Sequence, residues 1–270
     1  MSNRLDGYYM FQKNEMSSLP PMIADEAAFP SPRNDGLAGQ VVTYMRSYIE
    51  KNRLKPGDRL PGEAEIARAL GVSRPVVREA SRTLLARGLV EVAPGRAPRV
   101  SRMRVGQLRH FFEDALITGQ ADARHVLEVR RGLEIEMAAL AATRRSPEIV
   151  DRLTEIGAAM AERLRAPEAF VSLDMEFHRT IAAASANPFY VVLLDGCRAA
   201  VETSMDVGLR HRFGEAELQR VQDLHQQIID GVRKGDADAA AQAMTRHFDD
   251  ALAALYRAAA ADIPIGINQT

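Results

Sequence analysis

The stretch at residues 61–100 constrains the fold of this chain more than any other. Apolar residues recur at helical spacing over 63–70 and again from about 74 to 87. The glycine and serine between these segments are typical of a turn that ends one helix and caps the next. Two short β-rich runs follow at 89–93 and 99–102, joined by a Pro/Gly turn. This order predicts a helix-turn-helix followed by a two-stranded wing.

The second of these helices carries basic residues at its N-terminal end. Its apolar residues are expected to face inward: Val76, Val77, Ala80, Leu84 and Leu85. The outer face and N-terminal end are then left with Ser73, Arg74, Arg78 and Arg82. Recognition helices enter the DNA major groove in this way, and the wing turn adds Arg96 near a neighbouring groove. A solvated Arg-rich helix is the alternative, but the capped turn, basic helix end and basic wing together favour DNA binding.

The charge of the chain is distributed unevenly. Its net charge is only −1, yet residues 37–104 contain fourteen basic and six acidic side chains. A basic module on an acidic body is typical of a DNA-binding domain attached to a separate sensing or assembly domain, because neutralising phosphates supplies much of the affinity for DNA. The expected partner is therefore double-stranded DNA.

The segment LPGEAEIARALGVSRPVVREASRTLLARGLVE resembles the winged-helix signature of GntR-type bacterial transcription regulators. This resemblance implies that DNA is contacted by the turn, the second helix and the wing, through Ser73, Arg74, Arg78, Gly95 and Arg96. Ala64 stands where many members of the FadR-like branch carry a DNA-contacting arginine. The resemblance therefore implies that this one contact is missing here.

Composition places the protein in the cytoplasm. No apolar run approaches the roughly 20 residues that a membrane helix needs, and the N-terminus lacks a basic-then-apolar signal. The single cysteine, Cys197, excludes an intramolecular disulfide and fits a reducing compartment. We therefore expect no membrane partner.

The chain is predicted to be mainly α-helical, with four segments. Residues 1–36 show no sustained period and contain several prolines, which indicates a flexible arm. Residues 37–104 form the winged helix-turn-helix, beginning with a helix at 37–53. Residues 105–260 show only helical patterns and form an all-α domain, and residues 261–270 are a flexible tail.

The all-α domain is expected to contain about seven helices with short loops. Glycine and proline mark the breaks between them, for example at Gly119, Pro147 and Gly235. The expected helices lie near 105–118, 122–145, 147–164, 167–185, 188–210, 214–233 and 236–260. Helices of this number and spacing predict a helical bundle.

Four polar residues lie on or beside the apolar stripes of three of these helices. Asp174 and His178 are four residues apart on the helix at 167–185, and the last two helices contribute His225 and His247. Burying such groups is costly unless they are hydrogen-bonded or bound to a metal. A single core histidine is usually structural, but four such groups favour a divalent metal site. Zinc is the first candidate, and nickel, manganese or iron also fit.

Arg130 falls on the inward stripe of the helix at 122–145. A buried guanidinium favours a bidentate anion, so we expect it to bind an acidic effector. The alternative is an internal ion pair with Glu134, one turn further on. Asn187 and Arg198 are further candidates for effector binding, although Asn187 is expected mainly to cap the helix that follows it.

The helical part also resembles the FCD-type ligand-sensing domain of the FadR-like subfamily. The resemblance rests on E-x-R-x-x-L-E ending at Glu134, D-x-x-x-H from Asp174 to His178, a histidine before a helix ending in Gly-Asp, and M-x-x-H ending at His247. It implies a metal beneath a cavity that takes a small carboxylate or sugar acid. It also implies a homodimer.

Together these features predict a homodimeric transcription regulator, most often a repressor in this family, that reads a palindromic operator. An organic acid held by the metal and Arg130 would change operator binding. Two alternatives stay open: a metal-dependent enzyme acting on a small organic acid, and a DNA-binding dimer whose metal is purely structural. Because no positioned nucleophile or general base accompanies the candidate ligands, we expect no enzymatic activity.

Overall fold

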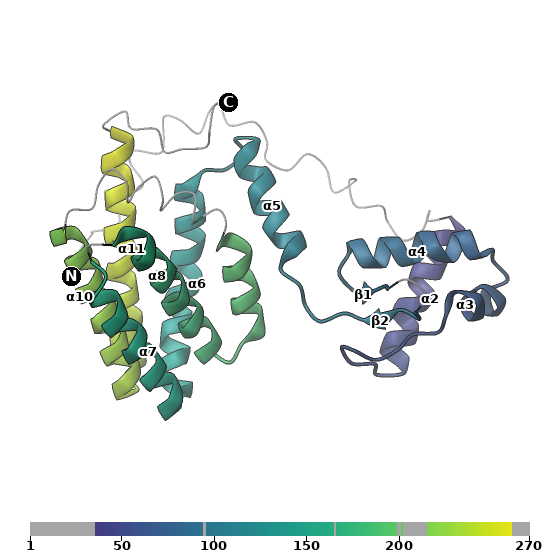
Figure 1. The fold of residues 1–270 in the computed structure, drawn as a ribbon, viewed down its shortest axis with the longest axis horizontal. Helices are drawn as coiled ribbons and strands as arrows, with labels where there is room; N and C mark the ends of the chain where they lie inside the picture. The colour runs from purple at the N-terminus through teal and green to yellow at the C-terminus, as the bar shows by residue number, and fades with distance from the viewer. Residues whose placement is uncertain (1–35, 94–95, 165, 199–200, 202–214, 261–270) are drawn as a thin grey trace, which may run out of the picture. The chain divides into compact units, whose positions relative to one another are not determined.

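The computed structural model describes residues 36–93, 96–164, 166–198, 201 and 215–260. The chain divides into two compact units, with the boundary between Ser101 and Arg102. Each unit is built around a hydrophobic core of its own. The labelled helices and strands of both units are drawn in Figure 1.

The described part of the N-terminal unit is a winged helix-turn-helix, as predicted. Its elements are α2 (Leu37–Lys51), α3 (Glu63–Leu70), α4 (Arg74–Ala86), β1 (Val90–Glu91) and β2 (Arg99–Val100). The two strands are antiparallel, with Val90 opposite Val100. Both strands are shorter than the predicted runs at 89–93 and 99–102. At the start of β1, the N–H of Leu89 donates to the Leu84 carbonyl at the end of α4.

The turn between α3 and α4 lies where it was predicted. Gly71 ends α3 in the left-handed conformation, with φ of 65°. Ser73 takes the predicted N-cap position of α4, without a side-chain hydrogen bond. Pro75 in the first turn has no N–H to offer, and the N–H of Val76 donates to the Ser73 carbonyl instead.

The core of this unit forms where α4 packs against α2. Val77 and Leu84 are fully buried, together with Met45 of α2. Leu85 was predicted to face inward but is 43% exposed. Adjacent helical residues point about 100° apart, so only Leu84 of this pair reaches the core.

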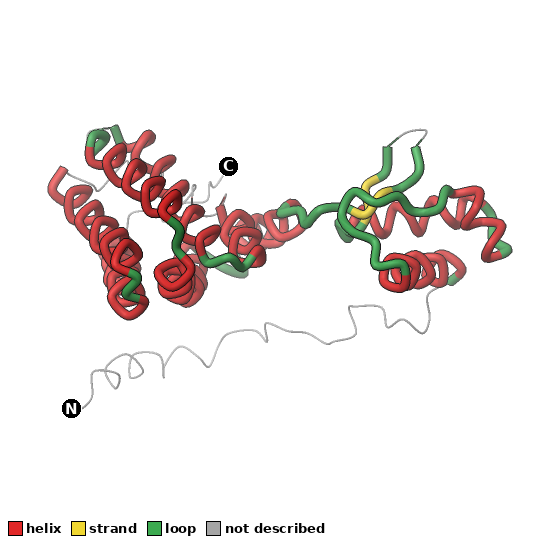
Figure 2. The backbone as a smooth tube through the Cα atoms, turned by 90° about the horizontal axis from the view of Figure 1, so that it is seen from below, coloured by secondary structure: helices red, strands yellow, loops and turns green. Residues whose placement is uncertain are grey.

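The described part of the C-terminal unit consists of helices joined by loops (Figure 2). Residues 188–198 are helical, and the remainder of the helix predicted at 188–210 lies outside the described residues apart from residue 201. None of the described helices is long and apolar enough to cross a membrane. The labelled helices are α5 (Gly106–Ile117), α6 (Ala123–Arg144), α7 (Pro147–Ala161), α8 (Pro167–Ala184), α10 (Glu215–Lys234) and α11 (Ala237–Ala260).

Helix α6 runs through the middle of this unit and packs against α8, α10 and α11. The side chains of Met137, Phe177 and Phe248, from three of these helices, are almost completely buried in the shared core. Positive φ angles at Gly119 and Gly235 confirm two of the predicted helix breaks. Because α6, α8, α10 and α11 all border one core, polar residues on their inner faces come close together.

Candidate metal centre and nucleic-acid interface

The N-terminal end of α4 exposes three of the predicted DNA contacts: Ser73, Arg74 and Arg78. Arg78 Nε donates a hydrogen bond to Glu63 Oε2 of α3, at 2.9 Å. Arg96 in the wing turn is also exposed. Gly95, the remaining predicted contact, lies outside the described residues.

Helix α4 presents these groups to solvent because its other face is buried. The Arg78 and Glu63 side chains are 60% and 34% exposed, so their ion pair is weak and Arg78 can exchange Glu63 for another anion. An exposed guanidinium group keeps most of its bound water on folding, so its desolvation cost is small. Such groups can then trade water for phosphates or base edges.

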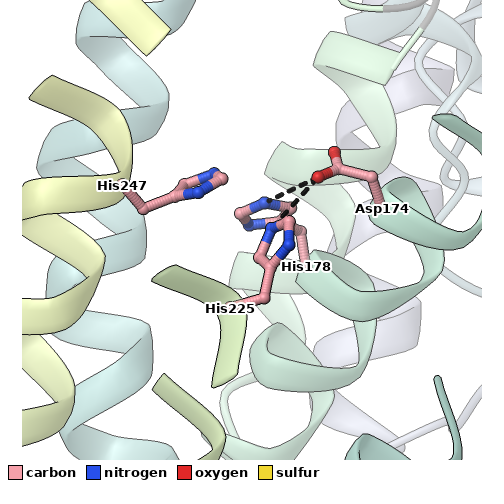
Figure 3. Close-up of side chains that lie close together, drawn as sticks. All are labelled: Asp174, His178, His225 and His247. Carbon is pink, nitrogen blue, oxygen red and sulfur yellow. Dashed lines mark ion pairs between the residues drawn. The ribbon is translucent and has the colours of Figure 1, made fainter. Parts of the chain in front are cut away.

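The four candidate metal ligands come together in the C-terminal unit. Asp174 and His178 lie one turn apart on α8, while α10 supplies His225 and α11 supplies His247 (Figure 3). The candidate ligand atoms of these residues all lie within 4.8 Å of one another. Each of the four residues is buried, and none is more than 7% exposed.

One carboxylate oxygen and three imidazole rings form the centre of this cluster. Asp174 Oδ1 lies 3.1 Å from His225 Nε2 and 3.8 Å from His178 Nε2 (Figure 3). The ring centroid of His247 is 4.6 Å from that of His225 and 4.9 Å from that of His178. The side chains of three helices thus converge on one point.

Several nitrogens of the cluster have no hydrogen bond. Among the described residues, neither ring nitrogen of His225 has a hydrogen-bond partner, and Nδ1 of His247 also lacks one. The 3.1 Å approach of His225 to Asp174 is therefore a close contact without hydrogen-bond geometry. A buried polar atom without a partner costs about 1–3 kcal/mol. A divalent cation would satisfy such atoms, so the residues fit a metal.

The electrostatics of the cluster favour metal-binding protonation states. Burial lowers the pKa of His225, and Asp174 only partly opposes this. Burial, together with His225 and His178, lowers the pKa of His247 well below its usual value. Burial alone would raise the pKa of Asp174, but attraction to His178 and His225 outweighs it and lowers the pKa. Neutral imidazoles beside an ionised carboxylate are the donor set that zinc and similar divalent metals prefer.

Arg130 lies next to this cluster in a buried ion pair. Its side chain is 4% exposed, and its Nε donates to Glu134 Oε1 at 2.6 Å. Its Nη2 has no hydrogen-bond partner within the described part of the chain. The guanidinium carbon lies 5.4 Å from the ring centroid of Phe248. The internal ion pair that was the alternative for Arg130 is thus present, and it leaves the buried Nη2 without a partner among the described residues.

Asn187 directly precedes the helical segment that begins at residue 188, and Arg198 lies within the described part of that segment. The Asn187 Oδ1 accepts a hydrogen bond from the Phe189 N–H at 3.1 Å, which is the capping role expected of it. Arg198 is half-buried. The effector-binding role predicted for these two residues stays a prediction.

Sequence reasoning missed one contact of the cluster. His178 Nδ1 is hydrogen-bonded to Glu134 Oε2, and the Glu134 side chain is fully buried. Burial alone would raise the pKa of Glu134, but attraction to Arg130 and His178 outweighs it and lowers the pKa. Glu134 was considered only as a partner of Arg130, because its spacing from His178 is 44 residues. Its place on the same inward stripe as Met137 and Ala141 was the available signal.

Two protein-family models match the chain. The model "Bacterial regulatory proteins, gntR family" matches residues 37–100, and the model of the FCD domain matches residues 125–250. The HTH-type transcriptional regulator LutR of Bacillus subtilis (strain 168) is 32% identical over 205 residues, which are 74% of this chain and 92% of LutR. The chain belongs to the GntR family.

Two further proteins are similar to this chain, one in sequence and one in fold. The HTH-type transcriptional repressor NanR of Escherichia coli (strain K12) is 30% identical over 221 residues, or 79% of this chain and 82% of NanR. The solved structure of Streptococcus agalactiae GntR covers 80% of this chain and 99% of its own, with a TM-score of 0.62 and 24% identity. At that identity, the structure shows a shared fold.

Membership of the GntR family decides whether the chain is a transcription regulator or a metal-dependent enzyme. A GntR-type N-terminal domain followed by an FCD domain is a DNA-binding transcription regulator, and the relatives are regulators, not enzymes. The alternative of a metal-dependent enzyme is therefore wrong for this chain. FCD domains commonly bind a metal, and the Asp/His cluster is a possible metal site within the matched region.

Proposed function

We propose that this GntR-family protein is a homodimeric repressor whose operator binding responds to a small carboxylate or sugar-acid effector. DNA would be read by residues 37–104. The metal, the effector and the partner subunit would be bound by residues 105–260. The observation that carries the proposal is the buried cluster of Asp174, His178, His225 and His247, which contains unpaired nitrogens. Glu134 connects this cluster to Arg130, whose Nη2 is also unpaired, because its carboxylate is hydrogen-bonded to both His178 and Arg130.

In the proposed centre, Asp174, His178, His225 and His247 hold one divalent metal. Zinc is the first choice for three imidazoles and a carboxylate, and nickel, manganese or iron also fit. When bound, the metal supplies a buried positive charge that attracts an acidic ligand. Arg130 is held through its Nε, so Nη2 is the nitrogen that would bind the carboxylate of the effector. Asn187 and Arg198 are the further candidates for effector contacts.

At the DNA end, the exposed Ser73, Arg74 and Arg78 would meet base edges and phosphates, with the wing at Gly95 and Arg96 in a neighbouring groove. Two copies of this unit in a dimer would read a palindromic operator. The assignment as a repressor draws on NanR, which is described as a repressor. An effector changes operator binding only if it binds the two arrangements of the dimer with different affinity.

The experiment that tests this proposal is a thermal-shift screen of small carboxylates and sugar acids. Metal-loaded protein and chelator-stripped protein are screened in parallel, and the uncharged amide of each active acid is the control. An acid at 100 times its dissociation constant stabilises the folded protein by about 2.7 kcal/mol. We expect an acid to stabilise only the metal-loaded protein and then to change its affinity for the operator.

A structural metal without an effector is the competing function, and the almost complete burial of the four side chains favours it. The same screen separates the two functions. If the metal stabilises the protein strongly and no acid adds to this, the metal is a structural element. If an acid stabilises both forms equally, its site is independent of the metal.

A further inference from the structure

Glu134 of α6 contacts the cluster, but the proposed metal and effector sites assign it no function. Its carboxylate is fully buried, and each of its two oxygens has a different partner. Oε1 accepts from Arg130 Nε at 2.6 Å, and Oε2 accepts from Nδ1 of His178. One carboxylate therefore joins the candidate effector contact to a candidate metal ligand.

The contact to Glu134 determines which nitrogen of His178 can bind a metal. A neutral imidazole carries one N–H and one lone pair, and the N–H goes to the better acceptor. With Nδ1–H donated to the Glu134 carboxylate, the lone pair lies on Nε2. Nε2 is also the nitrogen that faces the cluster, at 3.8 Å from Asp174 Oδ1. The hydrogen bond and the position of the ring thus agree.

We propose that Glu134 is a positioning residue that holds His178 in its metal-binding tautomer and orientation and, through Arg130 Nε, holds the guanidinium with Nη2 left for an anion. This inference rests on the proposed metal site. A residue that is hydrogen-bonded to a metal ligand, without contacting the metal itself, typically contributes to metal affinity. Its replacement lowers that affinity by about 10–100-fold. Because one carboxylate serves both groups, its loss weakens the metal site and the anion site together.

A purely structural function predicts something different. If Glu134 only neutralised the buried charge of Arg130, its replacement would destabilise the fold but leave the tautomer of His178 unchanged. The positioning function and the purely structural function of Glu134 therefore predict different protonation of the His178 ring nitrogens in a Glu134 variant. Long-range proton–nitrogen NMR of histidine-labelled protein measures which ring nitrogen carries the proton.

The test compares Glu134→Gln with two other variants of the full chain. Glutamine keeps the size of the side chain but has a single carbonyl oxygen, so it cannot accept from both Arg130 and His178. Glu136→Gln, at an exposed position on the same helix, is the matched control. Asp174→Asn removes a candidate ligand itself. Zinc affinity is measured by competition with a chromogenic chelator, using zinc ion alone as the probe.

We expect zinc affinity to fall about 10–100-fold in Glu134→Gln, to stay unchanged in Glu136→Gln, and to fall at least as far in Asp174→Asn. Wild-type affinity in Glu134→Gln, with a loss in Asp174→Asn, overturns the function of Glu134 but not the metal site. Wild-type affinity in Asp174→Asn overturns both. In metal-free wild-type protein His178 should carry its proton on Nδ1, and in metal-free Glu134→Gln this preference should be lost. A proton on Nε2 in the wild type, or an unchanged tautomer in the variant, overturns the inference.

Discussion

The candidate functional charges are exposed in the N-terminal unit and buried in the C-terminal unit. In the N-terminal unit, Arg74 and Arg78 lie on the surface, and the ion pair of Arg78 is largely exposed. In the C-terminal unit, Arg130, Glu134 and Asp174 are each at most 3% exposed. Exposed charges cost little on folding and suit a large polyanion such as DNA. Buried charges need specific partners, so buried polar atoms without a partner indicate which kind of ligand the site can bind.

The largest expected effect follows from removing two donors of the buried cluster. His225→Ala combined with His247→Ala leaves only α8 to hold a metal, so the purified variant should contain no stoichiometric divalent metal. Its melting temperature should no longer respond to a chelator. Elemental analysis and thermal unfolding measure both effects. His110→Ala, which changes an exposed histidine on α5, is the control and should keep its metal. Stoichiometric metal in the double variant would mean that the ion binds elsewhere.

Breaking the buried Arg130–Glu134 ion pair should destabilise the protein more than breaking the exposed Arg78–Glu63 pair. Arg130→Met leaves the buried Glu134 carboxylate without its cation, and we expect the free energy of unfolding to fall by about 3–5 kcal/mol. Arg78→Met breaks an exposed pair and should cost about 0–1 kcal/mol. Urea unfolding of the two variants, followed by circular dichroism, gives both values. Equal losses would contradict the contrast between the two units.

The function of the exposed arginines is tested on the operator. Arg74→Ala and Arg78→Ala should each weaken operator binding by about 1–3 kcal/mol if their side chains contact bases. Arg87→Ala, at the opposite end of α4, is the matched control and should have little effect. Fluorescence anisotropy with labelled operator DNA measures these affinities. Unchanged binding in both variants would remove α4 as the recognition helix.

The smallest effect is expected from the partner of Arg78. Glu63→Gln removes a negative charge beside the DNA-facing surface, so binding to non-operator DNA should rise a few-fold at low salt. This gain should shrink as salt increases, because exposed charges are screened. Titrations at two salt concentrations measure the difference. A loss of affinity as large as that of Arg78→Ala would instead show that Glu63 is needed to hold Arg78 in place.

Local chemistry explains the parts of the structure that could be predicted from the sequence. Gly71, Gly119 and Gly235 end helices because they adopt positive φ angles, and this property is visible in the chain. The spacing of Asp174 and His178 places both on one face of a helix, whatever packs against it. The helix-turn-helix, the shared face of Asp174 and His178, and the inward direction of His225 and His247 were therefore predictable from local patterns.

The errors arise where neighbours decide the outcome. Leu84 and Leu85 are equally apolar, and only packing against α2 selects which one is buried. Ser73 occupies the N-cap position without a side-chain hydrogen bond, and the N–H of Val76 donates to its carbonyl instead. The hydrogen bond between Glu134 and His178 joins two helices, and Gln222 of α10 likewise donates to the Gly157 carbonyl of α7. Contacts between helices depend on their packing, which periodicity along one chain does not specify.

The central claim is that Asp174, His178, His225 and His247 bind one divalent metal. The most direct measurement is anomalous diffraction from crystals of zinc-loaded protein, recorded on both sides of the zinc absorption edge. We expect one anomalous peak per chain, surrounded by these four side chains and with Nε2 of His178 facing it. A peak elsewhere, or none among these residues in zinc-loaded crystals, would contradict it.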